Sequence, residues 1–205
     1  MDTFTVLRGK AVPMMRANIN TDDIISAQAM AGKVDRIGEK LFTGWRFDLN
    51  GEKRRNFILN TPRYDGTRIL VAGINFGCGS SREAAVWALV DYGIRCVIAP
   101  GYGEIFHDNS YQNGLLPIVL EEAAVRRIAA AIEQAVEPVM AVDLTRCRIV
   151  LPDGVEIPFA IPDERRAALM AGMDELDVLL DRLPELDAFQ RKDRVARPWV
   201  WQDGA

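Results

Sequence analysis

Short apolar runs alternate with helical patterns along the middle of the chain, and this alternation limits the folds that the chain can adopt. The order is strand 68–73, helix 80–92, strand 96–100, helix 103–112, strand 116–120 and helix 121–136. Such an order is typical of parallel strands joined by helical crossovers. We therefore predict an α/β fold in which the parallel part of a sheet is flanked by helices.

The pattern changes on both sides of this central region. We expect a strand at 3–12 ended by Pro13, a loop at 26–40, a short helix at 41–47, consecutive strands at 141–144, 146–151 and 155–161 with a hairpin turn at 152–154, and helices from Asp163 onward. The later strands make the sheet mixed, and the end of the chain is helical. We predict one domain over residues 1–205, with its core at about 3–161 and a C-terminal helical appendage at about 163–201.

Composition narrows the class of protein. The chain has 205 residues, of which 49% are hydrophobic and 26% are charged, and these values are ordinary for a globular domain. The formal net charge of −4 gives no reason to expect binding to nucleic acid or to an anionic membrane. No apolar run approaches the roughly 20 residues that span a bilayer, and no signal peptide is evident. We expect a cytoplasmic protein.

Cysteine and histidine are scarce. The three cysteines, Cys78, Cys96 and Cys147, form no C-x-x-C pair, and the one histidine is His107. This set argues against a disulfide framework and against a zinc or iron–sulfur site held by this chain alone. We predict no metal ligands here. A mechanism that needs several histidines is excluded within the chain.

The segment between the first central strand and its helix carries the main functional signal. Gly77 and Gly79 allow close approach to the backbone, and Ser80, Ser81 and Arg82 follow at the expected start of a helix. Free N–H groups and the helix macrodipole attract anions there. A guanidinium suits bidentate binding of a carboxylate. We expect a small carboxylate or phosphate ligand.

Alternative interpretations of the segment differ in strength. The spacing of Ser80 and Glu83 also fits a capping box, which would be purely structural. A P-loop would need a lysine after the glycines, and Arg82 occupies the third glycine position of a dinucleotide fingerprint. A hydrolase triad would have to use His107. A carboxylate therefore fits better than a nucleotide.

Several segments together resemble one known family, the small subunits of 3-isopropylmalate dehydratase, which are swivel domains of the aconitase superfamily. The resemblance rests on residues 75–83 (NFGCGSSRE), 87–89 (WAL), 91–93 (DYG), 97–100 (VIAP), 105–106 (IF), 109–110 (NS) and 115–117 (LLP), with weaker matches at 18–25 and 41–46. It covers most of the chain from about residue 12 to residue 120.

The resemblance implies a fold and a chemistry. The fold is an aconitase swivel-like domain. The reaction is the interconversion of 2- and 3-isopropylmalate by loss and re-addition of water, in leucine biosynthesis. A large partner subunit would carry a [4Fe–4S] cluster, and the two chains would form a heterodimer or a higher assembly that binds a small dicarboxylate.

The resemblance also implies roles for individual residues. Ser80 matches the catalytic base, and Arg82 and Ser81 match groups that bind the substrate carboxylate. Five further candidate substrate-binding residues follow from the same match: Gly79, Thr21, Asp22, Ala29 and Met30, of which the last two would face the substrate's variable side chain. From the residues alone, 20–23 could equally be a helix N-cap.

The chain departs from the family pattern near these positions. It has Ala84 and Val86 where histidine and proline are common, and Ala29 and Met30 replace a bulkier pair. One methylene in an apolar pocket is worth only about 1–3 kcal/mol, so small changes can redirect preference. Two alternatives therefore stay open: a related hydro-lyase subunit acting on another 2-alkylmalate, and a non-catalytic carboxylate-binding module.

Overall fold

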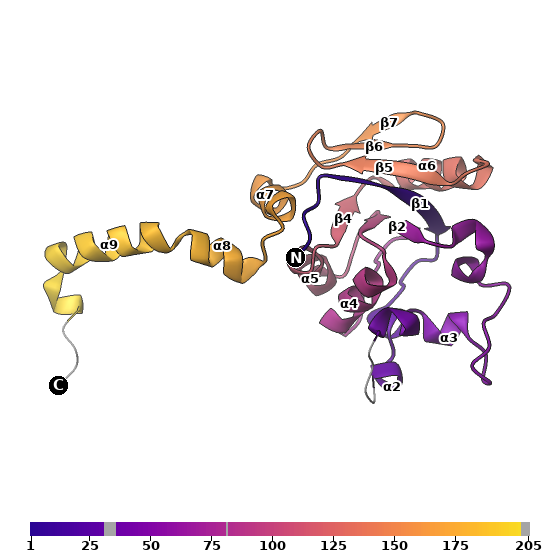
Figure 1. Cartoon of the computed structure of the whole chain (residues 1–205), viewed down its shortest axis with the longest axis horizontal. Coiled ribbons are helices and arrows are strands. Elements are labelled where there is room, and N and C mark those ends of the chain that lie inside the picture. The colour runs from indigo at the N-terminus through magenta and orange to yellow at the C-terminus, as the bar shows by residue number, and fades with distance from the viewer. Residues whose placement is uncertain (31–35, 81, 202–205) are drawn as a thin grey trace.

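The computed structural model describes residues 1–30, 36–80 and 82–201. A seven-stranded mixed sheet in the order β4-β3-β2-β1-β5-β6-β7 forms its centre (Figure 1). The strands are β1 (Val6–Met14), β2 (Thr67–Ala72), β3 (Cys96–Ala99), β4 (Leu116–Val119), β5 (Val139–Asp143), β6 (Arg148–Val150) and β7 (Glu156–Pro158). Strands β1 to β4 pair in parallel. Strand β5 pairs antiparallel with β1 and with β6, and β6 pairs antiparallel with β7. The predicted mixed α/β fold is confirmed.

Helices connect and flank the strands. The longer ones are α4 (Glu83–Tyr92), α5 (Glu104–Gln112), α6 (Glu122–Gln134), α7 (Asp163–Ala171), α8 (Glu175–Asp181) and α9 (Leu183–Ala196). The short ones are α1 (Thr21–Ile24), α2 (Ala27–Met30), η1 (Ile37–Lys40), α3 (Thr43–Arg46), η2 (Ile58–Asn60), η3 (Pro62–Tyr64) and η4 (Pro198–Val200). In Figure 1, α4 and α5 lie below the parallel strands and α6 lies above them.

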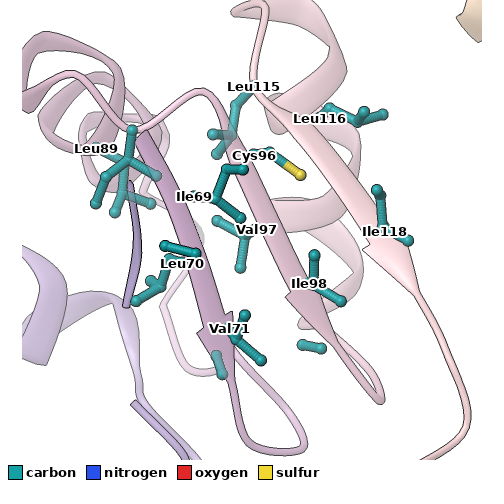
Figure 2. Close-up of a cluster of buried hydrophobic side chains, with 14 of the residues drawn as sticks. Ile69, Leu70, Val71, Leu89, Cys96, Val97, Ile98, Leu115, Leu116 and Ile118 are labelled. Carbon is teal, nitrogen blue, oxygen red and sulfur yellow. The ribbon is translucent and has the colours of Figure 1, made fainter. Parts of the chain in front are cut away.

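The parallel strands are buried on both faces. All four residues of β3 are fully buried, as are Ile69 to Ala72 of β2 (Figure 2). Strands covered by helices on both faces carry continuous apolar runs, and this explains why the sequence pattern located them well. From α6, the side chains of Val125, Ile128 and Ile132 reach the same core at helical spacing.

Two predictions about the N-terminal half were wrong in detail. Strand β1 runs through Pro13 to Met14, with Pro13 opposite Val71 of β2. Proline is tolerated there because β5 pairs only with residues 6–10 of β1, so the other side of Pro13 needs no ladder hydrogen bond. The expected loop at 26–40 contains α2 and η1, while residues 31–35 lie outside the described part.

Candidate functional site

The candidate site is the turn between β2 and α4, residues 74–82. Phe76 anchors its base: the ring is fully buried and lies edge-on to Phe106 of α5, with 5.3 Å between ring centroids. The Phe76 N–H donates to the Gly101 carbonyl at 3.0 Å, and the Phe76 carbonyl accepts from the Gly103 N–H at 2.9 Å. The turn is thus fastened to the segment that leads into α5.

Gly77 is required by this packing. Its φ is 71°, and a Cβ built on it would lie 2.2 Å from Cγ of Phe106. Any larger residue would therefore meet both backbone strain and an aromatic ring. Gly79 also has positive φ, at 90°, but the nearest atom to a built Cβ is Asn20 Cβ at 3.4 Å. The turn is closed on one side at Gly77 and open at Gly79.

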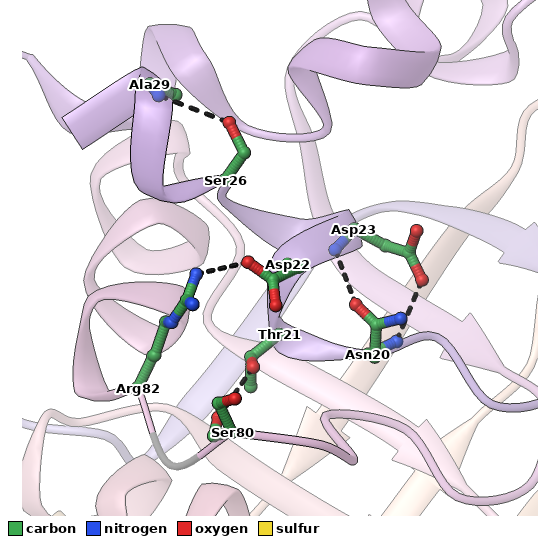
Figure 3. Close-up of polar contacts among 8 residues, drawn as sticks. All are labelled: Asn20, Thr21, Asp22, Asp23, Ser26, Ala29, Ser80 and Arg82. Atoms are coloured by element: carbon green, nitrogen blue, oxygen red, sulfur yellow. Dashed lines mark hydrogen bonds and ion pairs between the residues drawn. The ribbon is translucent and has the colours of Figure 1, made fainter. Parts of the chain in front are cut away.

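A second segment, residues 18–21, holds the other side of the turn, and Figure 3 shows its contact between Thr21 and Ser80. Four hydrogen bonds join them: Asn18 N–H to Ile74 O at 2.9 Å, Gly77 N–H to Ile19 O at 2.7 Å, Thr21 N–H to Cys78 O at 2.9 Å, and the Thr21 hydroxyl to Ser80 O at 2.6 Å. Asn75 Nδ2 also donates to Asn18 Oδ1 at 2.8 Å. The backbone of Ser80 is therefore set by a segment about sixty positions earlier in the chain.

The chemically useful groups lie at the outer end of the turn. Ser80 is exposed, and Arg82 is the N-cap residue of α4, with no side-chain cap for that helix among the described contacts. The Arg82 guanidinium forms an ion pair with the Asp22 carboxylate from α1 (Figure 3). Ser80 and Arg82 thus both lie near the N-terminus of α4, with the guanidinium directed toward Asp22 (Figure 3). Ser81 lies outside the described residues.

The capping-box interpretation of Ser80 and Glu83 is wrong. Helix α4 begins at Glu83 rather than at residue 80, and Glu83 Oε1 accepts a hydrogen bond from Asn113 Nδ2 at 2.9 Å. Its carboxylate is therefore directed toward the end of α5. The box that does form is at α1, where Asn20 accepts from Asp23 N–H at 2.7 Å and Asp23 accepts from Asn20 N–H at 3.1 Å.

The remaining candidate residues occupy distinct positions. Thr21 is 1% exposed and its hydroxyl is committed to Ser80, so in this structure it supports the turn. Ala29 and Met30 lie on α2 and pack half-buried against the core. The Ala29 N–H donates to Ser26 Oγ at 3.2 Å. None of the described hydrogen bonds or ion pairs joins α2 to Ser80 or Arg82.

The structure adds contacts that sequence reasoning missed. The Asp22–Arg82 ion pair and the Asn18–Asn75 amide pair both join residues far apart in sequence. Asn18 and Asn75 also share positive φ, at 55° and 62°. Asparagine tolerates this conformation better than most residues, so the two asparagines were the one sequence feature that could have pointed to the amide pair.

His107 belongs to the packing of α5 rather than to the turn. Its ring lies 5.4 Å from that of Tyr102 and 5.1 Å from that of Tyr111, measured between centroids. Burial lowers the pKa of the imidazole, with Asp108 acting in the opposite direction and Arg165 in the same direction. A neutral histidine packed between two tyrosines is consistent with a packing role.

No three histidine, cysteine, aspartate or glutamate side chains within the described part of the chain gather closely enough to hold a metal ion. No helix within it is both long and apolar enough to cross a membrane.

The fold and the turn together define the swivel-type domain of the aconitase superfamily. The family model for the aconitase C-terminal domain matches residues 1–123, which extend from β1 to the start of α6. The match includes residues 18–21 and the turn at 74–82.

Full-length relatives narrow the family. A 3-isopropylmalate dehydratase small subunit from Rhodospirillum centenum is 44% identical over 201 residues, covering 98% of this chain and 99% of the relative. The protein of that name from Cupriavidus necator is 46% identical over 210 residues and covers both chains completely. The crystal structure of 3-isopropylmalate dehydratase from Methanocaldococcus jannaschii matches with a TM-score of 0.63 and 25% identity, over 92% of this chain and 99% of the other. The chain belongs to the family of 3-isopropylmalate dehydratase small subunits.

Proposed function

We propose that the chain supplies one half of an active site that interconverts 2- and 3-isopropylmalate by dehydration and rehydration, as part of leucine biosynthesis. Full-length similarity to small subunits of that enzyme supports this proposal. The structural observation that carries it is the exposed Ser80 beside Arg82 at the start of α4. Small-subunit character implies a large-subunit partner.

Ser80 is the proposed base. As an alkoxide, its Oγ would take the proton from the carbon next to a carboxylate, and that carbon's electron pair would form the double bond as hydroxide leaves the neighbouring carbon. Re-addition of water in the opposite sense completes the interconversion. A serine hydroxyl is a very weak acid, so it needs nearby positive potential. Arg82 and the N-terminus of α4 supply that potential.

Arg82 is the proposed ligand for a substrate carboxylate, and the Asp22 carboxylate occupies that position before substrate binds. The guanidinium is half-buried and paired with the Asp22 carboxylate, which is the same chemical group that a dicarboxylate substrate would present. Substrate binding would therefore exchange one carboxylate for another. Gly79 and Ser81 would border this carboxylate, and Thr21 would keep Ser80 in position.

The large subunit is proposed to hold a [4Fe–4S] cluster, which when bound would supply the Lewis acid for the departing hydroxyl. This chain would supply proton transfer, carboxylate binding and part of the specificity. Ala29 and Met30 are the proposed contacts to the substrate's alkyl group, since α2 directly follows the α1 segment that pairs with Arg82.

Co-expression with a cluster-bearing large subunit tests the proposal. The assembled enzyme should form an alkene that absorbs in the ultraviolet, and Ser80→Ala should lower kcat by about 10²–10⁴-fold, the range for a positioned acid or base. Thr145→Ala, which removes an exposed hydroxyl from the turn between β5 and β6, is the matched control. Full turnover by an assembled Ser80→Ala enzyme would show that Ser80 is not the base.

A substrate panel on the same complex separates isopropylmalate from methyl-substituted and straight-chain malates. A preference for one of these would replace the proposed substrate and leave the site assignment unchanged. An isolated chain that binds dicarboxylates but forms no complex with a large subunit would favour the non-catalytic module instead.

A further inference from the structure

A polar pocket lies at the end of α4 that is farther from the turn at 74–82. Its volume is about 520 Å³, and its wall includes Gly66, directly before β2, and Tyr92, the last residue of α4. The turn at 74–82 follows β2 and precedes α4, so the pocket and the turn lie at opposite ends of both elements. A helix of the ten residues of α4 is about 15 Å long. The pocket is therefore separate from the candidate site.

A buried guanidinium forms part of the pocket wall. Arg46, the last residue of α3, is 5% exposed. Its Nε donates to Asn60 Oδ1 at 3.4 Å, and its Nη1 donates to the carbonyls of Glu39 at 3.4 Å and Leu41 at 3.2 Å. The Tyr92 ring lies 4.9 Å from Cζ, measured to its centroid. The guanidinium is thus fixed in place, but only neutral groups meet its charge, and two of the hydrogen bonds are long.

The Arg46 guanidinium keeps one nitrogen, Nη2, for another group. Nη2 donates no described hydrogen bond, whereas every fully buried side-chain nitrogen or oxygen of the described residues has a partner. Nη2 is therefore not fully buried, and the pocket is the space that it meets. None of the described ion pairs includes Arg46. A charge buried without an opposite charge is costly, and an anion in the pocket would offset that cost.

The other polar groups of the wall suit an anion. Lys53 is exposed, and its ammonium makes no described ion pair. The Tyr92 hydroxyl makes no described hydrogen bond, and burial raises its pKa, so it stays a neutral donor near pH 7. Asp65 is the one carboxylate among the described groups of the wall. The wall thus carries two positive charges and one negative charge, in a chain whose net charge is −4.

We propose that this pocket binds a small oxyanion, a carboxylate or a phosphate group, at a site separate from the turn at 74–82. Arg46 Nη2 and the Tyr92 hydroxyl would donate to its oxygens, and Lys53 would supply the second positive charge. The proposal does not depend on the reaction proposed at Ser80. Arg46 near the C-terminus of α4 also opposes the helix macrodipole, but that role needs neither Lys53 nor an accessible Nη2.

Titration calorimetry of the isolated full-length chain in chloride-free buffer tests the site. Inorganic phosphate and malonate are the two probes, and Arg82→Gln is the background, because it removes the proposed carboxylate ligand at the turn. We expect one ion to bind per chain with a dissociation constant of about 0.1–1 mM. Tighter binding of phosphate would identify a phosphoryl ligand, and tighter binding of malonate a carboxylate ligand. Either preference supports the site.

Variants of two exposed wall residues locate the binding. Lys53→Gln should raise the dissociation constant about tenfold, and Asp65→Asn should lower it at least about threefold, because it removes the one negative charge. Arg55→Gln changes an exposed basic side chain outside the wall, and it should leave the constant within about twofold. The side chains of Lys53 and Asp65 make no described hydrogen bond or ion pair, so these variants should keep the fold.

Three results would overturn the proposal. One is the absence of binding of both anions at about 10 mM, which would leave Arg46 with a structural role alone. The second is an equal effect of Lys53→Gln and Arg55→Gln, which would mean that the anions meet only general surface charge. The third is weaker binding in Asp65→Asn, which would mean that the pocket prefers a cationic group.

Discussion

At the residue scale, the site depends on side chains that never meet the proposed substrate. Thr21 is the clearest case, because it is buried and its hydroxyl donates to the Ser80 carbonyl at 2.6 Å. The sequence could indicate that Ser80, Ser81 and Arg82 belong together, since they are adjacent. It could not indicate the role of Thr21, because that role depends on a pairing between segments 59 positions apart.

The variant Thr21→Val should separate the positioning of Ser80 from the binding of substrate. Valine has almost the same shape as threonine, so the main loss is one buried hydrogen bond, worth about 1–2 kcal/mol of unfolding free energy. We expect kcat of the assembled enzyme to fall with little change in KM, because Ser80 shifts while Arg82 keeps its place. Thr21→Ser keeps the hydroxyl and should restore kcat. Equal kcat values for the valine and serine variants would remove Thr21 from the positioning of Ser80.

Gly77→Ala tests the packing under the turn. Positive φ costs a non-glycine residue about 1–2 kcal/mol. Gly154 gives a matched control, since its φ is 84° and a Cβ built there has nothing within 4 Å. At Gly77 the clash with Phe106 adds a second cost of about 1–3 kcal/mol. Urea unfolding should therefore show a greater loss of stability for Gly77→Ala than for Gly154→Ala, and equal losses would mean that the ring moves aside freely.

At the element scale, the accuracy of the sequence predictions follows burial. Strands β2 to β4 were located within a residue or two, because each is a continuous apolar run. Helix α4 was expected from residue 80 but begins at Glu83. Glu83, which was expected to close a capping box with Ser80, accepts a hydrogen bond from Asn113 at the end of α5, a partner that local spacing does not reveal.

Helix α5 carries His107, the only histidine in the sequence. The pH dependence of the unfolding free energy between about pH 5.5 and 7 should therefore come mainly from this side chain. Burial lowers the pKa of His107 in the folded state. The unfolded chain then binds more protons in this range, and stability falls as pH falls below about 6.5. His107→Gln should flatten this part of the curve of unfolding free energy against pH. An unchanged slope in the variant would assign the effect to other groups.

At the scale of the whole molecule, the last helix, α9, makes no described polar contact with the sheet. The described hydrogen bonds and ion pairs of α9 join it only to residues 182–201. Among them, Asp193 accepts from Arg197 Nε at 2.7 Å and from Trp201 Nε1 at 2.9 Å. We therefore propose that α8 and α9 are the appendage, and that the core extends past residue 161 into α7, whose Leu169 is fully buried and whose Arg166 Nε donates to the Leu144 carbonyl at 3.1 Å. Trp201, which also lies against the Arg194 guanidinium, therefore packs on α9 rather than on the sheet.

A chain ended after Arg182 tests this division. Because α9 adds no described polar contact to the sheet, calorimetry should place the melting temperature of the shortened chain within about 2–4 °C of the full chain, a change of at most about 1 kcal/mol. The comparison is made at a concentration where both chains are monomeric, so that association does not contribute. A much larger drop would mean that α9 belongs to the core.

The turn at 74–82 is hydrogen-bonded both to residues 18–21 and to residues 101–103, and this has a consequence for folding. Residues 18–21 can reach residues 74–80 only after β1 has aligned beside β2, with Val12 opposite Leu70 and Met14 opposite Ala72. A collapsed chain with this parallel pair shifted by one residue would still bury most apolar side chains, but it would leave Ser80 unsupported. Competence for catalysis would therefore appear only when the register is correct, and the rate at which a refolding chain regains activity would measure strand alignment separately from compaction.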